Sequence, residues 1–560
     1  MHQLTATSLL VCSMSLPLPL QAETATPSMG EKPVPIPAEG MPNSANGKTD
    51  TRQFFRFTLQ HRFNGGEPLP KDTIEIPFKE FSNNPWASLK AIKQNFSKHL
   101  EKQGKPAEID TRFTFLQFPE EMQITGQLPS SNIKTTVNSD GTGKSTWNAP
   151  AYQLGFAQGD HKGTLNWHGG EVQFRFTDKF ESISSQFKFS KITFKTPEGL
   201  SVSFGKSTGN SLFNAQFELT EMNFTFPVEV RYGKKFSLSL GETTFSQTGK
   251  FNQMALNLPS LKMREKDAQV KMNLRDMTFK YNTEKTNTGL ELGNFTLKMG
   301  YWDAIQEGSS TSGSDWIMTM TSEEKEGIVN YLLESQTGKM NLSIDSLLAL
   351  DFDKEVGSLA FRNLDAEALL VLYTMIHDVL ESGNTEDQGV LFGALGRLMM
   401  LIPQVLAKSP EIAIAEALET TMGNVQGDMS IRLNGEKVTA FFEVPALISA
   451  LQAQANFVIS EKLLKKILPS ILMLEMQEQL KQKGKEATAA DLVHLQKKAK
   501  AASKELIRDL VNFGLLVKAG ENYRLNADYN ENHLKINGQE IPLPPPFGAA
   551  MPSQPHYPTP

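Results

Sequence analysis

The sequence predicts an α+β protein: a long, twisted antiparallel β-sheet, built as a meander that can curl into a groove, is followed by helices and a C-terminal three-strand meander. Three observations predict this. Apolar residues occupy every second position in short runs from about residue 163 to residue 299, with turn-forming residues between the runs. After residue 360 the apolar period becomes that of a helix, and short alternating runs return after residue 514. A sheet of about ten strands does not stay flat, so we expect it to twist or curl.

The composition is that of a folded, slightly acidic protein. Of the 560 residues, 39% are hydrophobic and 21% are charged, and the net charge is −6. This balance argues against nucleic acid as a partner, and the sequence has no basic patch interleaved with aromatic residues. Phenylalanine, with 35 copies against 5 tryptophans and 9 tyrosines, fills many of the alternating positions, where it packs well on a pleated surface.

The N-terminus has the features of an export signal. Residues 9–20 form an apolar stretch too short to span a bilayer, and Ala22 suits cleavage, so residues 1–22 are predicted to be a signal peptide. The only cysteine, Cys12, lies inside it, and lipid attachment at Leu9–Cys12 or retention in the membrane are the alternatives. A mature chain without cysteine excludes disulfides, thiol catalysis and thiolate metal sites.

Two proline-rich segments flank the folded region. Residues 23–50 are predicted to be a disordered linker and residues 544–560 a disordered tail, because neither buries enough apolar surface to fold. Residues 51–150 form an N-terminal α+β region. Its expected elements are a strand over 51–63, a helix over 86–100, strands at Phe113–Phe115 and Met122–Ile124, and a polar, turn-rich stretch over 132–148.

Residues 151–360 are predicted to form the extended antiparallel sheet, with one apolar face. Strict alternation places the apolar side chains of each run on one side of the strand. Which partner covers this face, other protein or a bound apolar ligand, is left open by the sequence. The candidate apolar ligand face consists of Phe174, Phe176, Phe187, Phe189, Phe224, Phe226, Phe236 and Leu238.

Residues 361–543 are predicted to mix helices and strands. The expected elements are a helix over 364–380 with Asn363 as its N-cap, a helix over 389–407 bent at Pro403, strands within 412–433, a short helix over 445–455, long helices over 461–482 and 489–513, and strands at 515–517, 523–529 and 534–536. Residues 456–513 hold 11 Lys or Arg against 7 Asp or Glu. The apolar stripe of these helices can lie on an anionic bilayer, but we expect it to pack on the neighbouring sheet.

The C-terminal residues carry a resemblance to a known family. Residues 514–523, GLLVKAGENY, followed by residues 533–539, HLKINGQ, resemble the closing signature of the YdgA-like family of bacterial envelope proteins, a family defined as a domain of unknown function. Further stretches similar to this family are residues 362–369, 408–412, 163–167 and 196–200. The resemblance covers about residues 155–543. It implies an envelope protein that faces the periplasm, without an established catalytic activity.

No catalytic, cofactor or metal site is predicted. The nine histidines include no helical i, i+4 pair of the zinc-protease kind. His161 and His168, which flank a predicted strand near Trp167 and Asp160, come nearest to a cluster. His377 lies one turn from Tyr373 and is interpreted as a surface or core histidine. The sequence has no G-x-S-x-G elbow and no phosphate-binding loop. We therefore expect a protein that is not an enzyme.

Two hypotheses of different classes follow. In the first, the chain is an exported, non-enzymatic protein of the periplasm or cell envelope that binds lipid or another apolar ligand along the sheet, with peripheral membrane contact. In the second, it is a structural or assembly protein of the envelope, whose helices fill the apolar face and whose exposed edges or tails bind other envelope proteins. Neither hypothesis involves nucleic acid or a cofactor.

Overall fold

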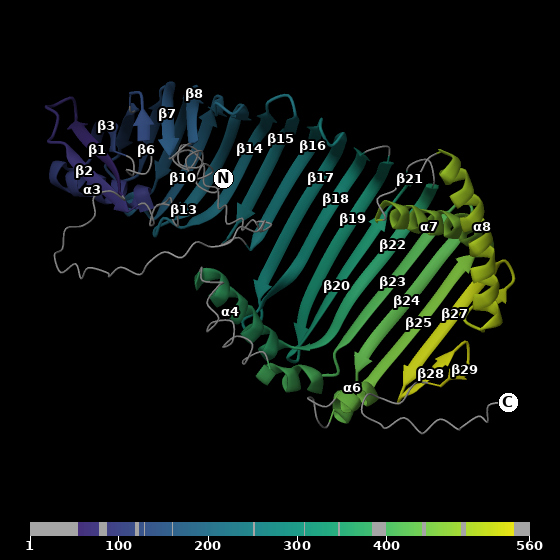
Figure 1. The fold of residues 1–560 in the computed structure, drawn as a ribbon. Helices are drawn as coiled ribbons and strands as arrows, with labels where there is room; N and C mark the ends of the chain where they lie inside the picture. Colours follow the sequence, from purple (N-terminus) through teal and green to yellow (C-terminus); the bar gives the residue numbers. More distant parts are fainter. Residues whose placement is uncertain are drawn as a thin grey trace, which may run out of the picture. The chain divides into compact units, whose positions relative to one another are not determined.

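Figure 1 shows the computed structural model of the chain. It describes residues 54–77, 87–117, 123–127, 129–158, 161–249, 252–306, 309–344, 348–382, 399–438, 444–482 and 489–542. The chain divides into two units, residues 1–250 (unit 1) and residues 251–560 (unit 2). The predicted signal peptide, proline-rich linker and proline-rich tail lie outside the described residues.

The protein is mainly β. Strands account for 62% of the described residues and helices for 21%, and the strand pairings within each unit are antiparallel. The prediction of an α+β fold, with a sheet that gives way to a helical region, is therefore wrong. Helical periodicity is a strong local signal, whereas a short strand is stabilised by partners far away in the sequence. The sequence pattern of the C-terminal third therefore indicates its helices more clearly than the strands between them.

Unit 1 contains fifteen described strands, one α-helix and one short 3₁₀-helix. They are β1 (Phe54–Phe63), β2 (Asp72–Pro77), α3 (Ala87–Gln103), β3 (Ala107–Gln117), β4 (Gln123–Thr125), β5 (Ser130–Val137), β6 (Gly143–Ala149), β7 (Tyr152–Gln158), β8 (His161–Trp167), β9 (Gly170–Phe176), η2 (Asp178–Phe180), β10 (Ser182–Phe189), β11 (Ile192–Lys195), β12 (Leu200–Phe204), β13 (Ser207–Asn214), β14 (Leu219–Tyr232) and β15 (Phe236–Thr248).

The strands of unit 1 form two arms that share β14. The first arm runs in the order β2-β1-β3-β5-β6-β9-β10-β13-β14, and the second in the order β4-β7-β8-β11-β12-β14. Residues up to Thr225 of β14 pair with the first arm, and residues from Val228 pair with the second. Pro227 lies at the change-over, beside a register shift against β15, and lacks the N–H that a regular ladder needs.

The inner sides of the two arms meet in a common core. Val172, Phe187 and Phe189 of the first arm belong to the same buried cluster as Leu165, Trp167 and Ile192 of the second. The ring centroids of Trp167 and Phe189 lie 5.2 Å apart across this core. The two arms therefore pack face to face in the manner of a sandwich.

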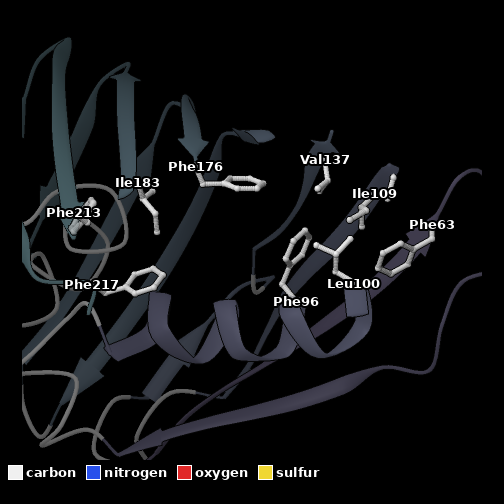
Figure 2. Packing of buried hydrophobic residues seen from close by; sticks show 10 residues of the cluster. Phe63, Phe96, Leu100, Ile109, Val137, Phe176, Ile183, Phe213 and Phe217 are labelled. Atoms are coloured by element: carbon white, nitrogen blue, oxygen red, sulfur yellow. The ribbon is translucent and has the colours of Figure 1, made fainter. Parts of the chain in front are cut away.

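Helix α3 covers the rest of the inner side of the first arm. Figure 2 shows Phe96 and Leu100 pointing from α3 toward Ile109 and Val137 on the sheet, in one buried cluster with Phe176. The predicted helix over 86–100 and the strand over 51–63 are found as α3 and β1.

Strands β5 and β6 make up most of residues 132–148, the stretch that was predicted to be polar and turn-rich. Their hydroxyl side chains pair with one another: Thr135 Oγ1 lies 2.8 Å from Ser145 Oγ, and Trp147 Nε1 donates to Ser131 Oγ at 2.7 Å. These half-buried strands tolerate polar residues because the polar side chains satisfy one another's hydrogen bonds across the ladder.

Unit 2 contains fourteen described strands with helices between them. They are β16 (Gln253–Glu265), β17 (Val270–Lys285), β18 (Glu291–Gln306), β19 (Ser309–Lys325), β20 (Ile328–Thr337), β21 (Met340–Ile344), β22 (Leu348–Asp365), α4 (Ala366–Ser382), a helix at residues 399–407, β23 (Glu411–Thr420), β24 (Gly423–Leu433), η3 (Gly435–Lys437), α6 (Val444–Ala450), β25 (Leu451–Ser460), α7 (Glu461–Gln482), α8 (Ala489–Asn512), β26 (Val517–Ala519), β27 (Asn522–Asn530), β28 (His533–Ile536) and β29 (Gln539–Ile541).

These strands follow one another across a single sheet. The order is β16-β17-β18-β19, then β20 and β21 side by side along β19, then β22-β23-β24-β25-β27, with β26 and β28 both on the far edge of β27. The predicted terminal meander is thus no separate module, because β27 pairs along its whole length with β25. The predicted helix over 445–455 ends at Ala450, since the following residues pair with strands on both sides.

A row of irregular positions crosses β16 to β19. Pro259, Asp276, Gly300 and Asp315 stand opposite one another, and none takes part in the regular ladder. Asp276 and Asp315 have left-handed φ angles of 55° and 56°. The pairing resumes on both sides of each irregular position, for example at Leu258 and Ser260 on β16.

The helices of unit 2 lie at the two ends of the strands (Figure 1). Helices α7 and α8 lie at one end, and α4 and α6 at the other. Helix α4 begins with Asp365, whose Oδ1 accepts the N–H of Ala368 at 2.9 Å, so Asp365 is the N-cap and the predicted Asn363 is not. Of the predicted helix over 389–407, residues 399–407 are helical and the rest lies outside the described residues.

Candidate functional site

Five of the eight predicted ligand-face residues lie in the core between the two arms of unit 1, and a sixth lies under α3. Phe187, Phe189 and Phe224 are at most 4% exposed in one cluster, and Phe174 and Phe226 pack against it. Phe176 is buried beneath α3. The other two, Phe236 and Leu238, are half-buried on β15, opposite Tyr232 and Val230. At the other six positions, the alternating face of unit 1 is covered by protein.

One face of the sheet of unit 2 carries two continuous rows of apolar side chains. In the first row, residues directly opposite one another on eleven strands are Met254, Tyr281, Phe295, Met320, Leu333, Leu359, Ile414, Met429, Ala455, Ala527 and Ile536. In the second row they are Tyr331, Phe361, Ile412, Ile431, Ala453, Tyr529, Leu534 and Ile541. We call these two rows the apolar face.

No residue of the apolar face is buried. At its centre, on β22, β23 and β24, the most exposed large side chains are Phe361 (37%), Ile412 (45%), Ile414 (41%), Met429 (41%) and Ile431 (39%). Because these five are direct cross-strand or same-strand neighbours, they form one contiguous patch. Single exposed apolar residues are ordinary, but a contiguous patch marks an interaction site.

Helices border the apolar face on both sides. Leu463 of α7 is buried against Phe352, with Leu418 and Val425 around it, at one end of the strands. At the other end, Leu369 and Leu370 of α4 pack near Tyr331. Near α6, the hydroxyl of Tyr529 donates to the carbonyl of Ile448 at 3.1 Å. The prediction that the apolar stripe of α7 packs on the sheet is confirmed, but this helix leaves the central patch exposed.

The opposite face of the same strands is polar. Asn456 donates to Asp428 Oδ2 at 2.8 Å and accepts from Asn526 at 2.5 Å, so three neighbouring strands are joined by a ladder of side-chain hydrogen bonds. Gln454 adds a bond to Asp528 at 3.2 Å. The strands therefore separate their polar and apolar side chains, as in an antiparallel sheet with one wet face.

The alternation of Ile412 and Ile414, and of Met429 and Ile431, was visible in the sequence, but nothing in it distinguished these residues from core residues. Their alternate positions carry Ala413, Ala415 and Ser430, which give a weak polar signal. Burial of a strand face depends on whether a second layer packs on it, and this is a tertiary property.

A group of hydrogen-bonded polar side chains lies between α3 and the first arm of unit 1. His61, which is 2% exposed, has Nδ1 2.8 Å from Thr111 Oγ1 and Nε2 2.8 Å from Asn95 Oδ1. Asn95 donates its amide to Asp72 at 2.9 Å, and His99 Nε2 bonds the same carboxylate oxygen at 2.5 Å. Since the Asn95 oxygen can only accept, His61 carries its proton on Nε2 and accepts from Thr111.

This network is structural. Thr111 is 4% exposed, so its hydroxyl is closed to a substrate, and the bonds tie α3 to β1 and β2. The hydrogen bonds from Asn95 and then His99 hold the pKa of Asp72 below its usual range. Burial lowers the pKa of His61, although its bond to Asn95 opposes this shift. This network was not predictable from the sequence, because its members lie up to 50 positions apart.

The lowered pKa of His61 predicts a pH-dependent stability. The unfolded chain binds a proton on His61 near pH 6.5, whereas the folded chain does so only at lower pH, so stability falls as the pH drops below 6.5. Urea midpoints between pH 7.5 and pH 5.5 should fall less in His61→Gln than in the unmodified protein. The control is His494→Gln, which changes an exposed histidine. A fall in urea midpoint that is the same in His61→Gln as in the control would contradict the prediction.

A family model described as bacterial protein of unknown function (DUF945) matches residues 107–228 and residues 216–544. The chain belongs to this family. No curated protein and no solved structure gives a match.

The DUF945 match contains the whole apolar face, from Met254 to Ile541. Of the His61 network, it contains only Thr111, because the other four residues precede residue 107. The apolar face is thus the candidate site within the family region. In the described part of the chain, no three His, Cys, Asp or Glu residues are grouped to hold a metal ion, and none of the helices there has the length and hydropathy to cross a membrane.

Proposed function

We propose that the protein is an exported, non-enzymatic protein of the bacterial cell envelope and that the apolar face of unit 2 binds the acyl chain of a lipid. The observation that carries this proposal is the unbroken first row of apolar side chains across eleven strands, none of them buried. The short apolar stretch at residues 9–20, and the resemblance of residues 514–523 and 533–539 to the YdgA-like family, support export and an envelope location.

The dimensions of the apolar face suit an acyl chain. Eleven strands spaced at about 4.8 Å give a row of about 48 Å. The hydrocarbon core of a bilayer, which is two acyl chains thick, is about 30 Å, so one extended chain fits along the row. A ligand that lies across the strands would contact apolar atoms along its whole length.

The side chains of the apolar face also suit a flexible ligand. Met254, Met320 and Met429 are unbranched and polarizable, and such side chains adapt to irregular apolar partners. The central patch stays accessible between the bordering helices α7 and α4. A surface that binds a rigid protein partner typically relies instead on a few buried aromatic or arginine side chains.

Binding of a polyene fatty acid, whose fluorescence rises in apolar surroundings, tests this function. The double variant Ile414→Asn and Met429→Asn replaces a cross-strand pair at the centre of the face, and we expect its Kd to rise more than tenfold, because burying each CH2 contributes about 0.8 kcal/mol. Both side chains are 41% exposed, so stability should change little. The control, Ala415→Asn with Ser430→Asn, changes the polar face of the same strands and should bind the probe normally.

Two outcomes would overturn the proposal. One is a folded, unmodified protein that neither binds the probe nor carries lipid when purified from the envelope. The other is a photo-crosslinking amino acid at position 414 that captures protein but no lipid in cells, which would favour the assembly role.

A further inference from the structure

Helix α8 uses one stripe for packing. Leu495 and Ala499 pack with Met473 of α7, and Ile507 packs with Ile459 and Tyr523 of the sheet. These α8 residues are spaced four or eight apart, so they lie along one side of the helix. Ser503 is buried on the same side, and Leu492 and Leu510 pack against the same two clusters.

A basic stripe runs beside the packed one. Lys497, Lys500, Lys504 and Arg508 follow one another at intervals of three or four residues, and all are exposed. Arg508 bonds Glu505 at 3.2 Å and Asp509 at 3.3 Å. For the three lysines, no ion pair is found within the described part of the chain, so their charges are available to a partner.

Exposed apolar residues mark both ends of this stripe. Val493 lies one turn before Lys497 and is 55% exposed, and Val511 lies one turn after Arg508 and is 37% exposed. Phe513, just beyond the helix, is 73% exposed, although its N–H is held by the carbonyl of Asp509 at 2.8 Å. Exposed apolar residues together with lysines on one helix are typical of a helix that rests on a lipid surface.

We propose that the basic stripe of α8, with Val493, Val511 and Phe513, docks on the surface of an anionic lipid bilayer. The three lysines would face the headgroups, and the apolar residues would enter the boundary with the acyl chains. Nucleic acid suits this surface less, because the exposed apolar residues have no role on a phosphate backbone and the chain as a whole is acidic. The docking surface shares no residue with the apolar face, so vesicle binding and fatty-acid binding can fail separately.

Flotation of the full chain with vesicles tests the basic stripe. The vesicles are either pure phosphatidylcholine or phosphatidylcholine with 30% phosphatidylglycerol. We expect binding to the anionic vesicles that falls at least tenfold in Lys497→Glu/Lys500→Glu/Lys504→Glu and in high salt. The control Lys271→Glu/Lys280→Glu/Lys298→Glu makes the same charge change on exposed lysines of the sheet and should bind as the unmodified protein does.

The apolar contribution is tested by Phe513→Ser, which should weaken vesicle binding about threefold to tenfold. Met400→Ser is the matched control, because Met400 is 71% exposed on the helix at residues 399–407. All variants retain residues 1–53, so differences among them cannot arise from that segment. Equal binding to neutral and anionic vesicles, no vesicle binding, or unchanged binding by the Lys→Glu variant of α8 would each overturn the proposal.

Discussion

Phe189→Ala is expected to lower the free energy of unfolding by about 3–5 kcal/mol while leaving fatty-acid binding unchanged. Phe189 is 2% exposed, and its ring centroid lies 5.2 Å from those of Phe187 and Trp167. Truncation therefore opens a cavity between the two arms of unit 1, and nothing in this core needs a ligand to fill it. Urea unfolding followed by circular dichroism and tryptophan fluorescence measures the loss.

Phe361→Ala is the matched variant on the apolar face. Phe361 is 37% exposed, so its loss should cost about 1 kcal/mol or less in stability, but should weaken probe binding. The two variants remove the same side chain from strands of the same alternating pattern. If Phe189→Ala abolished binding and Phe361→Ala did not, the ligand would lie in unit 1, as the sequence suggested.

Gly209→Ala is expected to destabilise the protein by about 2–3 kcal/mol. Gly209 on β13 stands opposite Phe187 and Phe224, and an added Cβ would lie 2.4 Å from both the Phe187 ring and the Asn223 carbonyl oxygen. Because the carbonyl belongs to the backbone of the next strand, the clash cannot be relieved by a rotamer change. The same unfolding measurement applies.

Gly427→Ala provides the control for this substitution. Gly427 also lies within a strand, opposite Phe457, but an added Cβ would meet that ring at 3.5 Å, an ordinary contact. Alanine should be neutral there, or slightly stabilising, since it restricts the unfolded chain. A loss of stability in Gly427→Ala equal to that in Gly209→Ala would show that crowding is not the cause.

The local elements were largely predictable. The alternating runs, the helices α3, α7 and α8, and the strand predicted at residues 523–529 follow from period and turn residues. The errors share one physical cause, which is pairing with distant strands. Thr135 and Ser145 look like loop residues, but they meet across a ladder. Ala453 seems to continue a helix, but it pairs with β24 on one side and β27 on the other.

The sequence by itself determined that many strands of this protein have one apolar and one polar face, because alternation fixes the side of the strand on which each side chain lies. Only the tertiary structure decided what each apolar face meets. In unit 1, the sheet divides at Pro227, its second arm buries Phe187 and Phe189, and α3 buries Phe176. In unit 2, helices pack at the strand ends, and Ile412 and Ile414 stay exposed. A strand's own residues do not specify whether a second layer covers them, since that layer comes from elsewhere in the chain.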